Sequence, residues 1–139
     1  MVHVMDEGVF DHPVEKIWRY LNDEKGHQHS SVKMSKAIEQ SEKGMLAEFE
    51  VKNPDGSWRK EMWKMSFNPP RGFTLEITSG PMKGTKHTHT YTPMGNKTKV
   101  SVEGEFVGQG MDDATLKKAA LMMFEQVFNE DAANLRNFK

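Results

Sequence analysis

The sequence predicts an α+β fold in which a curved antiparallel sheet of about seven strands surrounds a long C-terminal helix, with two short helices after the first strand. Two observations predict it. Residues 112–138 contain neither Gly nor Pro and repeat apolar residues at spacings of three and four, which is typical of an amphipathic helix. Residues 34–107 alternate apolar and polar residues in short runs between turns, which is typical of strands with one dry face. The helix and the sheet can therefore bury each other's apolar surface.

Composition and charge exclude several classes of protein for this chain. The chain has 139 residues, a formal net charge of -1 and no cysteine. The length suits a single domain over residues 1–139, and the lack of cysteine excludes disulfides and thiol catalysis. The balanced charge offers no basic surface to a nucleic acid. The first ten residues lack the features of a secretory signal, and no apolar run approaches the ~18 residues of a membrane span. We expect a cytoplasmic protein with no membrane span and no nucleic-acid partner.

The first forty residues predict one strand and two short helices. Residues 2–10 form an extended run rich in valine, which predicts the first strand. Pro13 suits the first turn of a helix that ends near residue 23. The apolar residues of this helix recur at the spacing of a single face, at Val14, Ile17, Trp18 and Leu21. The polar residues 26–33 predict one further helical turn before the next strand.

The middle of the chain predicts six strands, and its end predicts the long helix. The alternating runs cover residues 34–40, 45–52, 57–67, 73–78, 85–92 and 98–108. Turn-forming residues separate them, as in Asn53–Gly56 and Asn68–Gly72. The carboxylate of Asp112 or Asp113 can cap the first turn of the last helix, which runs to Phe138. Its apolar residues form two neighbouring rows, one of Leu121, Phe124, Phe128, Ala132 and Leu135 and one of Leu116, Ala120, Met123 and Val127.

Three segments resemble those of a known superfamily. HPVEKIWRYLND (residues 12–23) resembles its opening Pro-Val-Glu-x-Val-Trp helix, SFNPPRGFTLEI (residues 66–77) its Pro-Pro-Arg turn, and TYTPMGNKTKVSV (residues 90–102) its Pro-x-Gly-x-x-Thr hairpin. In order and spacing the chain is similar to the START-like (SRPBCC) superfamily with the helix-grip fold, which includes polyketide cyclases. The resemblance implies a cavity between sheet and last helix that binds lipids, polyketides or other apolar molecules. It carries over no shared catalytic set.

The predicted alternation defines the lining of such a cavity. Ten residues fall on the inward face of the sheet, namely Phe49, Glu61, Trp63, Met65, Leu75, His87, His89, Tyr91, Val102 and Phe106. Met123 and Val127 of the last helix complete the predicted lining. Most of these side chains are apolar, as expected for a core or for a pocket that takes an apolar ligand.

Four of these residues are polar although the face should be dry: Glu61, His87, His89 and Tyr91. Buried polar groups need partners, which are each other, water or a ligand. His87 and His89 lie two apart on one strand, so their imidazoles suit ligand contact or acid–base chemistry. A metal would need further ligands from Glu61 and from His27 or His29. We predict no metal and no cofactor. Two alternatives give the pair no functional role: a hydrogen-bonded cluster in the core, or a shift of the strand register by one residue that turns both side chains to solvent.

Three functions compete at this stage. The first is binding of a small, mostly apolar ligand of lipid, polyketide or aromatic type. The second is a polyketide cyclase-like enzyme without cofactor, in which His87 or His89 acts as acid and base. The third is a protein-interaction module similar to the Hsp90-ATPase-activator-like branch, with a filled core and an exposed apolar patch. The sequence has no G-x-S-x-G elbow and no phosphate-binding loop, so binding is favoured over catalysis. We expect a monomer or a homodimer.

Overall fold

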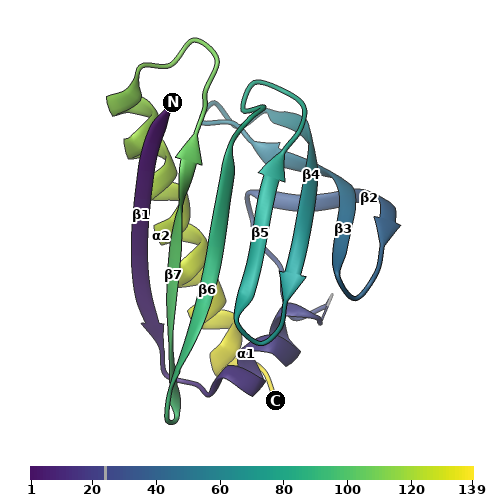
Figure 1. The fold of residues 1–139 in the computed structure, drawn as a ribbon, viewed down its shortest axis with the longest axis vertical. Helices are drawn as coiled ribbons and strands as arrows, with labels where there is room; N and C mark the ends of the chain where they lie inside the picture. The colour runs from purple at the N-terminus through teal and green to yellow at the C-terminus, as the bar shows by residue number, and fades with distance from the viewer. Residues whose placement is uncertain (24) are drawn as a thin grey trace.

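The computed structural model describes residues 1–23 and 25–139, and it is a seven-stranded antiparallel sheet with a long helix along one face (Figure 1). The strand order is β1-β7-β6-β5-β4-β3-β2. The elements in chain order are β1 (Val2–Phe10), α1 (Val14–Leu21), β2 (Val32–Gln40), β3 (Gly44–Lys52), β4 (Trp58–Asn68), β5 (Gly72–Ile77), β6 (Lys86–Met94), β7 (Lys97–Phe106) and α2 (Asp113–Asn137). Among the described residues, neither helix is at once long and apolar enough to cross a membrane.

The strand registers confirm the alternation that the sequence predicts. Phe49 of β3 lies opposite Glu61 of β4. Leu75 of β5 lies opposite His87 of β6, and His89 lies opposite Val102 of β7. Residues directly opposite each other point to the same face of a sheet. The ten residues expected on the inward face therefore share one face, and it is the face toward α2.

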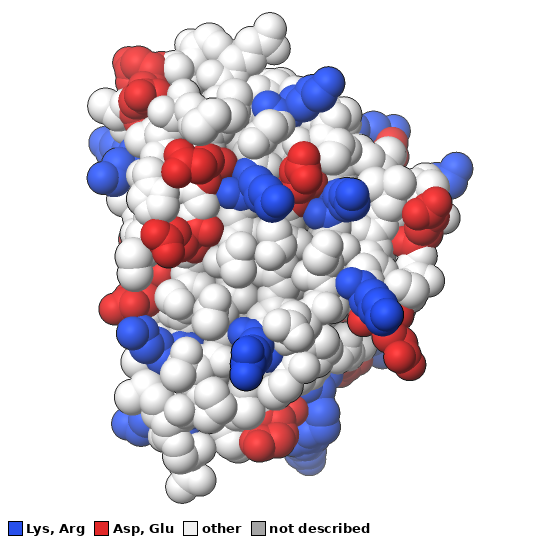
Figure 2. Space-filling view, viewed as in Figure 1, with Lys and Arg blue, Asp and Glu red and all other residues white. Residues whose placement is uncertain are grey.

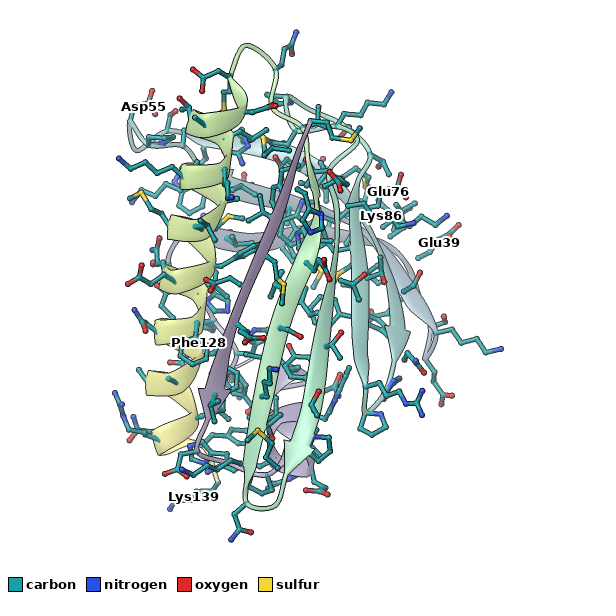
Figure 3. The ribbon with its side chains drawn as sticks, turned by 60° about the vertical axis from the view of Figure 1, so that its left-hand side comes forward. Glu39, Asp55, Glu76, Lys86, Phe128 and Lys139 are labelled. Atoms are coloured by element: carbon teal, nitrogen blue, oxygen red, sulfur yellow. The ribbon has the colours of Figure 1, made fainter. Side chains whose placement is uncertain are left out.

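The long helix begins where the sequence predicts. The side chain of Asp112 accepts a hydrogen bond from the backbone N–H of Thr115, which caps the first turn. The helix packs mainly against β1, and also against β7, at one edge of the sheet. Figure 3 shows the labelled side chain of Phe128 between α2 and β1. Its ring stacks on Phe10 at a centroid distance of 4.5 Å, and a Cβ added at Gly8 would meet it at 2.6 Å.

Two apolar clusters form the core, and both lie under the helices. One contains Phe10, Val14, Ile17, Tyr20, Tyr91, Val100 and Leu135. The other contains Val4, Val102, Phe106, Leu116, Ala120 and Phe124. Among the described residues, β3 and β4 contribute no member to either cluster. The two clusters therefore fill the β1, β7 and β6 half of the inward face, and the β3 and β4 half lies outside them, although Ala47 and Val51 of β3 are buried there.

The second short helix expected within residues 26–33 is a wrong prediction. Residues 25–31 form turns and irregular backbone, and β2 then begins at Val32; Glu24 lies outside the described residues. The physical reason is that this segment contains Gly26 and no apolar row that a helix could bury. Its side chains instead make hydrogen bonds to α2, as described below.

The sheet has one face turned away from α2 and two edge strands, and these differ in how far their side chains are exposed. The convex face in Figure 2 carries Lys and Arg interspersed with Asp and Glu, so no large patch of one sign covers it. Glu76 and Lys86 lie opposite each other on this face, and Figure 3 shows them pointing away from α2. Strand β2 forms one edge, and its side chains from Lys33 to Gln40 are all exposed. The edge strand β1, by contrast, is covered by α2.

Candidate functional site

Three polar side chains of β6 point toward α2, and we call His87, His89 and Tyr91 the polar row. His89 Nε2 and His87 Nδ1 lie 3.0 Å apart and share one hydrogen bond, in which one ring nitrogen donates and the other accepts. The imidazole of His87 stacks on Phe106 at 5.3 Å, and that of His89 stacks on Phe73 at 4.4 Å. The aromatic neighbours fix both rings, so the pair is held in one arrangement.

The polar row keeps hydrogen-bonding capacity that the protein does not use. Among the described residues, His87 Nε2, His89 Nδ1 and the Tyr91 hydroxyl make no hydrogen bond to a protein atom. The only fully buried side-chain polar atom without a partner in the described part of the chain is Ser31 Oγ. The three free atoms of the polar row therefore reach accessible space, where water or a ligand can bind them.

Burial controls the protonation of the polar row. It lowers the pKa of His87 to about 4. Burial, and secondarily the charge of His87, lowers the pKa of His89 well below its ordinary value. Burial raises the pKa of Tyr91 above its ordinary value. At neutral pH the two imidazoles and the phenol are all uncharged, which suits contact with an uncharged ligand.

Glu61 is buried, as expected for the inward face, but its carboxylate is already paired. Arg59 Nε donates to Glu61 Oε2 at 2.8 Å, and Trp63 Nε1 donates to Glu61 Oε1 at 2.9 Å. All three residues lie on β4 at spacings of two, so they share one face. This ion pair and hydrogen bond occupy both carboxylate oxygens. Glu61 therefore does not join the polar row as a metal ligand.

Aromatic and aliphatic side chains border the uncovered half of the inward face. The rings of Phe49 and Trp63 stack at a centroid distance of 4.0 Å, and both remain partly exposed. Met65 is also partly exposed on β4. Met123 and Val127 are partly buried on α2, one helical turn apart. Met123 packs against the core cluster that contains Val102, Phe106 and Phe124, whereas Phe49, Trp63 and Met65 lie outside both core clusters.

The twelve residues predicted from the sequence thus occupy two kinds of position. Those that are buried in the sheet are Glu61, Leu75, His87, Tyr91, Val102 and Phe106. Those that are partly exposed on the inward face or on α2 are Phe49, Trp63, Met65, His89, Met123 and Val127. Two shallow surface depressions lie away from all twelve residues. One is on the convex face around Lys64 and Glu76, and the other is on the outer side of α2 around Met122 and Asn129.

Sequence reasoning missed several neighbours of the polar row. Phe124 of α2 contacts both imidazoles edge-on, with ring centroids 5.8 Å from His87 and 6.5 Å from His89. Phe73 stacks on His89, and Arg59 pairs with Glu61. Phe73 and Arg59 had a usable signal, because each lies two residues from a predicted inward residue on its own strand. Phe124 was assigned to the core row of the helix, and its contact with the histidines depends on how α2 docks.

His27 and His29 do not join the polar row either. Their ring nitrogens instead face Asp131 of α2, within 4.8 Å of one another as a group of three. Burial raises the pKa of Tyr20, whose hydroxyl donates to Asp131, and that hydrogen bond raises it further. Burial lowers the pKa of His27. Burial also opposes the charge of His29, but hydrogen bonds and charge from Asp131 and Glu130 outweigh it and raise the pKa of His29.

Comparison with known proteins agrees with this architecture. Residues 1–137 match the family model described as polyketide cyclase / dehydrase and lipid transport. No curated protein matches the sequence. The fold is similar to that of a START superfamily protein from Mycobacterium smegmatis, with a TM-score of 0.82, 11% identity and 99% of each chain covered.

Two further solved structures are similar. A protein from Thermus thermophilus has a TM-score of 0.77 at 12% identity, with 97% of each chain covered. The di-domain ARO/CYC StfQ from the steffimycin biosynthetic pathway has a TM-score of 0.72 at 12% identity, over 98% of this chain and 50% of that chain. At such identities the likeness concerns the fold. It confirms the helix-grip architecture that the three sequence segments predict.

Proposed function

Because the chain belongs to the polyketide cyclase, dehydrase and lipid transport family, we propose that it binds a small, mostly apolar molecule between its sheet and α2. The ligand lies against Phe49 and Trp63, and it is oriented by the polar row. Apolar burial supplies most of the affinity, and the few polar atoms supply the selectivity. A ligand of lipid, polyketide or aromatic type has this balance of surfaces.

One observation carries the proposal, which is the unused hydrogen-bonding capacity of the polar row. A solid core would pair its polar atoms internally, because a buried unpaired donor or acceptor costs about 1–3 kcal/mol. Glu61 follows that rule, with both oxygens bonded within β4. The polar row does not, since His87 and His89 share one hydrogen bond and their outer nitrogens are free among the described residues. A ligand hydroxyl or carbonyl satisfies such atoms.

A cyclase-like enzyme is the second candidate, because two adjacent imidazoles can relay a proton. One of the similar folds belongs to an ARO/CYC protein, although that likeness concerns architecture. The pKa of His87, lowered to about 4 by burial, makes its imidazole a weak base at neutral pH. Binding is therefore favoured over acid–base catalysis. The third candidate is an interaction module with a filled core, and it has less support because the outer nitrogens of His87 and His89 make no hydrogen bond among the described residues.

Native mass spectrometry of the purified protein tests the proposal. The informative variant is His87→Leu/His89→Leu, because leucine keeps much of the side-chain volume and removes the ring nitrogens. We expect the wild-type protein to retain an adduct of small-organic mass, and the variant to bind it about tenfold more weakly. Titration with the fluorescent apolar probe 1-anilinonaphthalene-8-sulfonate gives a second readout if the natural ligand is lost during purification.

The matched control is Thr88→Ala/Thr90→Ala, which changes the opposite face of the same strand. We expect this control to bind both adduct and probe like the wild type. Equal binding by the leucine variant and the control would exclude a role for the polar row. Failure of the wild type to bind either adduct or probe would argue against a ligand site altogether.

A further inference from the structure

A second polar cluster lies where the loop after α1 meets α2, about one hundred residues away in sequence. It contains His27 and His29 from the loop, and Glu130 and Asp131 from the helix. His29 Nε2 lies 3.1 Å from His27 Nε2 and 3.1 Å from Asp131 Oδ1. His27 Nε2 lies 3.6 Å from the same carboxylate oxygen. Three ligand-type atoms from three residues therefore converge on one point.

The outer nitrogens of the two histidines fix their tautomers. His29 Nδ1 lies 2.7 Å from Glu130 Oε1, and His27 Nδ1 lies 3.3 Å from the backbone oxygen of Leu21. A carbonyl and an ionised carboxylate only accept hydrogen bonds, so each Nδ1 carries the hydrogen. In the neutral rings both Nε2 atoms then present lone pairs. With both rings neutral, these two lone pairs and the Asp131 carboxylate would repel one another, so a cation between them, either a proton on Nε2 or a metal ion, stabilises the arrangement.

The spacing of the three atoms matches a tetrahedral metal ion. Bonds of about 2.0–2.1 Å at tetrahedral angles separate neighbouring ligand atoms by about 3.3 Å. The observed separations are 3.1, 3.1 and 3.6 Å. An ion can therefore reach all three atoms at normal bond lengths with little movement of the side chains. Two imidazoles and one carboxylate suit a divalent transition metal such as zinc, and they are poor ligands for calcium or magnesium.

We propose that His27, His29 and Asp131 form a binding site for a divalent transition metal ion of the Zn²⁺ class. Three protein ligands leave the fourth position of a tetrahedral ion for water or for a donor atom of a bound molecule. This site is separate from the polar row, and the inference does not depend on the proposed ligand-binding function.

The surroundings of the cluster resemble the outer shell of a metal site. Metal-binding histidines usually donate their second ring N–H to a carboxylate or a backbone carbonyl, as both do here. The Ser30 hydroxyl and Tyr20 hydroxyl in turn donate to Glu130 Oε2 and Asp131 Oδ1, each at 2.5 Å. These bonds hold the acidic groups in place before any ion arrives.

Two other histidine sites among the described residues lack this arrangement. The nitrogens of His3 face two different carboxylates, Nε2 toward Glu103 at 2.8 Å and Nδ1 toward Glu105 at 2.9 Å, so they diverge. His87 and His89 approach each other, but among the described residues no carboxylate joins them in a candidate metal group. Both sites therefore supply controls within the same molecule.

The test is a titration of chelator-treated protein with Zn²⁺, followed by calorimetry, and with Co²⁺, followed by visible absorption. We expect one equivalent to bind, with the intense Co²⁺ absorption of a tetrahedral site. His27→Gln and His29→Gln should each weaken binding by more than about 100-fold, and Glu130→Gln by about 10- to 100-fold through the outer shell. His3→Gln, at an exposed histidine outside both sites, should bind like the wild type.

Two measurements guard against a variant that simply fails to fold. Asp131→Asn keeps an acceptor for the Tyr20 hydroxyl and removes the anionic ligand, so it should stay folded and lose the metal. Long-range ¹H–¹⁵N spectra of the wild-type histidines should show Zn²⁺ shifting the Nε2 signals of His27 and His29 only. Lack of stoichiometric binding, unchanged binding in His27→Gln, or shifts at His3 or His87 instead would overturn the site. In that case a shared proton is the cation that holds the cluster together.

Discussion

Side chains two residues apart on one strand determine which buried polar groups of this protein find hydrogen-bond partners. Arg59, Glu61 and Trp63 lie on β4 and satisfy the buried carboxylate within a single strand. His87 and His89 repeat the spacing on β6, but an imidazole pair can make only one hydrogen bond internally. The same spacing therefore gives both oxygens of the Glu61 carboxylate a partner, whereas it leaves ring nitrogens of the histidine pair available to a further partner.

The buried histidines predict a loss of stability in mild acid. His87 has a pKa of about 4 in the folded protein and about 6.5 in the unfolded chain. Between these two values the unfolded chain is protonated at His87 and the folded protein is not, so protonation favours unfolding. Stability is therefore complete above about pH 6.5 and falls as the pH drops toward 4. Between pH 6.5 and 5 we expect His87 to account for a decrease of about 2 kcal/mol in the free energy of unfolding. Urea unfolding at a series of pH values measures it.

His87→Phe is the control for this pH dependence, because phenylalanine can keep the stacking on Phe106 and does not titrate. The variant should lose about 1.4 kcal/mol per pH unit of slope below pH 6.5 relative to the wild type. His12 and His27, whose pKa values are also lowered by burial, contribute equally to both proteins and cancel in the comparison. The pKa of His89 is lowered by burial in both proteins and by the charge of His87 in the wild type only, so the difference in slope reports His87 together with its effect on His89. Identical slopes would mean that His87 is protonated in the folded state.

At the scale of elements, α2 connects the two edges of the sheet. One side of the helix packs Phe128 against the edge strand β1. Another side binds the loop that leads into the opposite edge strand, where Gln126 and Glu130 both contact Ser30. The helix therefore contacts both edges of the sheet, at β1 and at the loop before β2, so destabilising α2 should weaken both edges.

Removing the cap of α2 should measurably weaken the fold. Asp112→Ala deletes the acceptor for the Thr115 N–H, which lies 2.7 Å away, and we expect the free energy of unfolding to fall by about 1 kcal/mol. Asp112→Asn should restore most of the loss. Asp113→Ala is the matched control: its ion pair with the amino terminus at 3.4 Å is exposed on both sides and should contribute little. Equal losses in both alanine variants would contradict a specific capping role.

At the scale of the whole molecule, the two edges of the sheet should differ in stability. Strand β1 is covered by α2, whereas all side chains of β2 after Val32 are exposed. Local opening needs less free energy where few apolar contacts are broken. We expect backbone amides of β2 to exchange with deuterium much faster than the hydrogen-bonded amides of β1, as measured by two-dimensional NMR. Equal protection of both edges would show that the sheet opens as one unit.

The sequence allowed the fold and the inward face to be predicted because their signals are local. Alternation over a few residues sets the face of His87 and Trp63, and Asp112 marks the start of α2 by chemistry within one turn. The cluster of His27, His29 and Asp131 had no such signal, since the docking of α2 brings together residues about one hundred positions apart. Polarity alone, read as a helical turn, led to the wrong structure for this loop.

The strand order also has a consequence for synthesis of the chain. From β2 to β7 each strand pairs with the next, so these hairpins can form as soon as they leave the ribosome. Strand β1 comes first but pairs with β7, with Val2 opposite Phe106. It therefore emerges long before its partner exists, with Val4 and Phe10 unburied until α2 follows. During synthesis β1 therefore stays unpaired until β7 has been made, and its apolar side chains are exposed to chaperones in that interval.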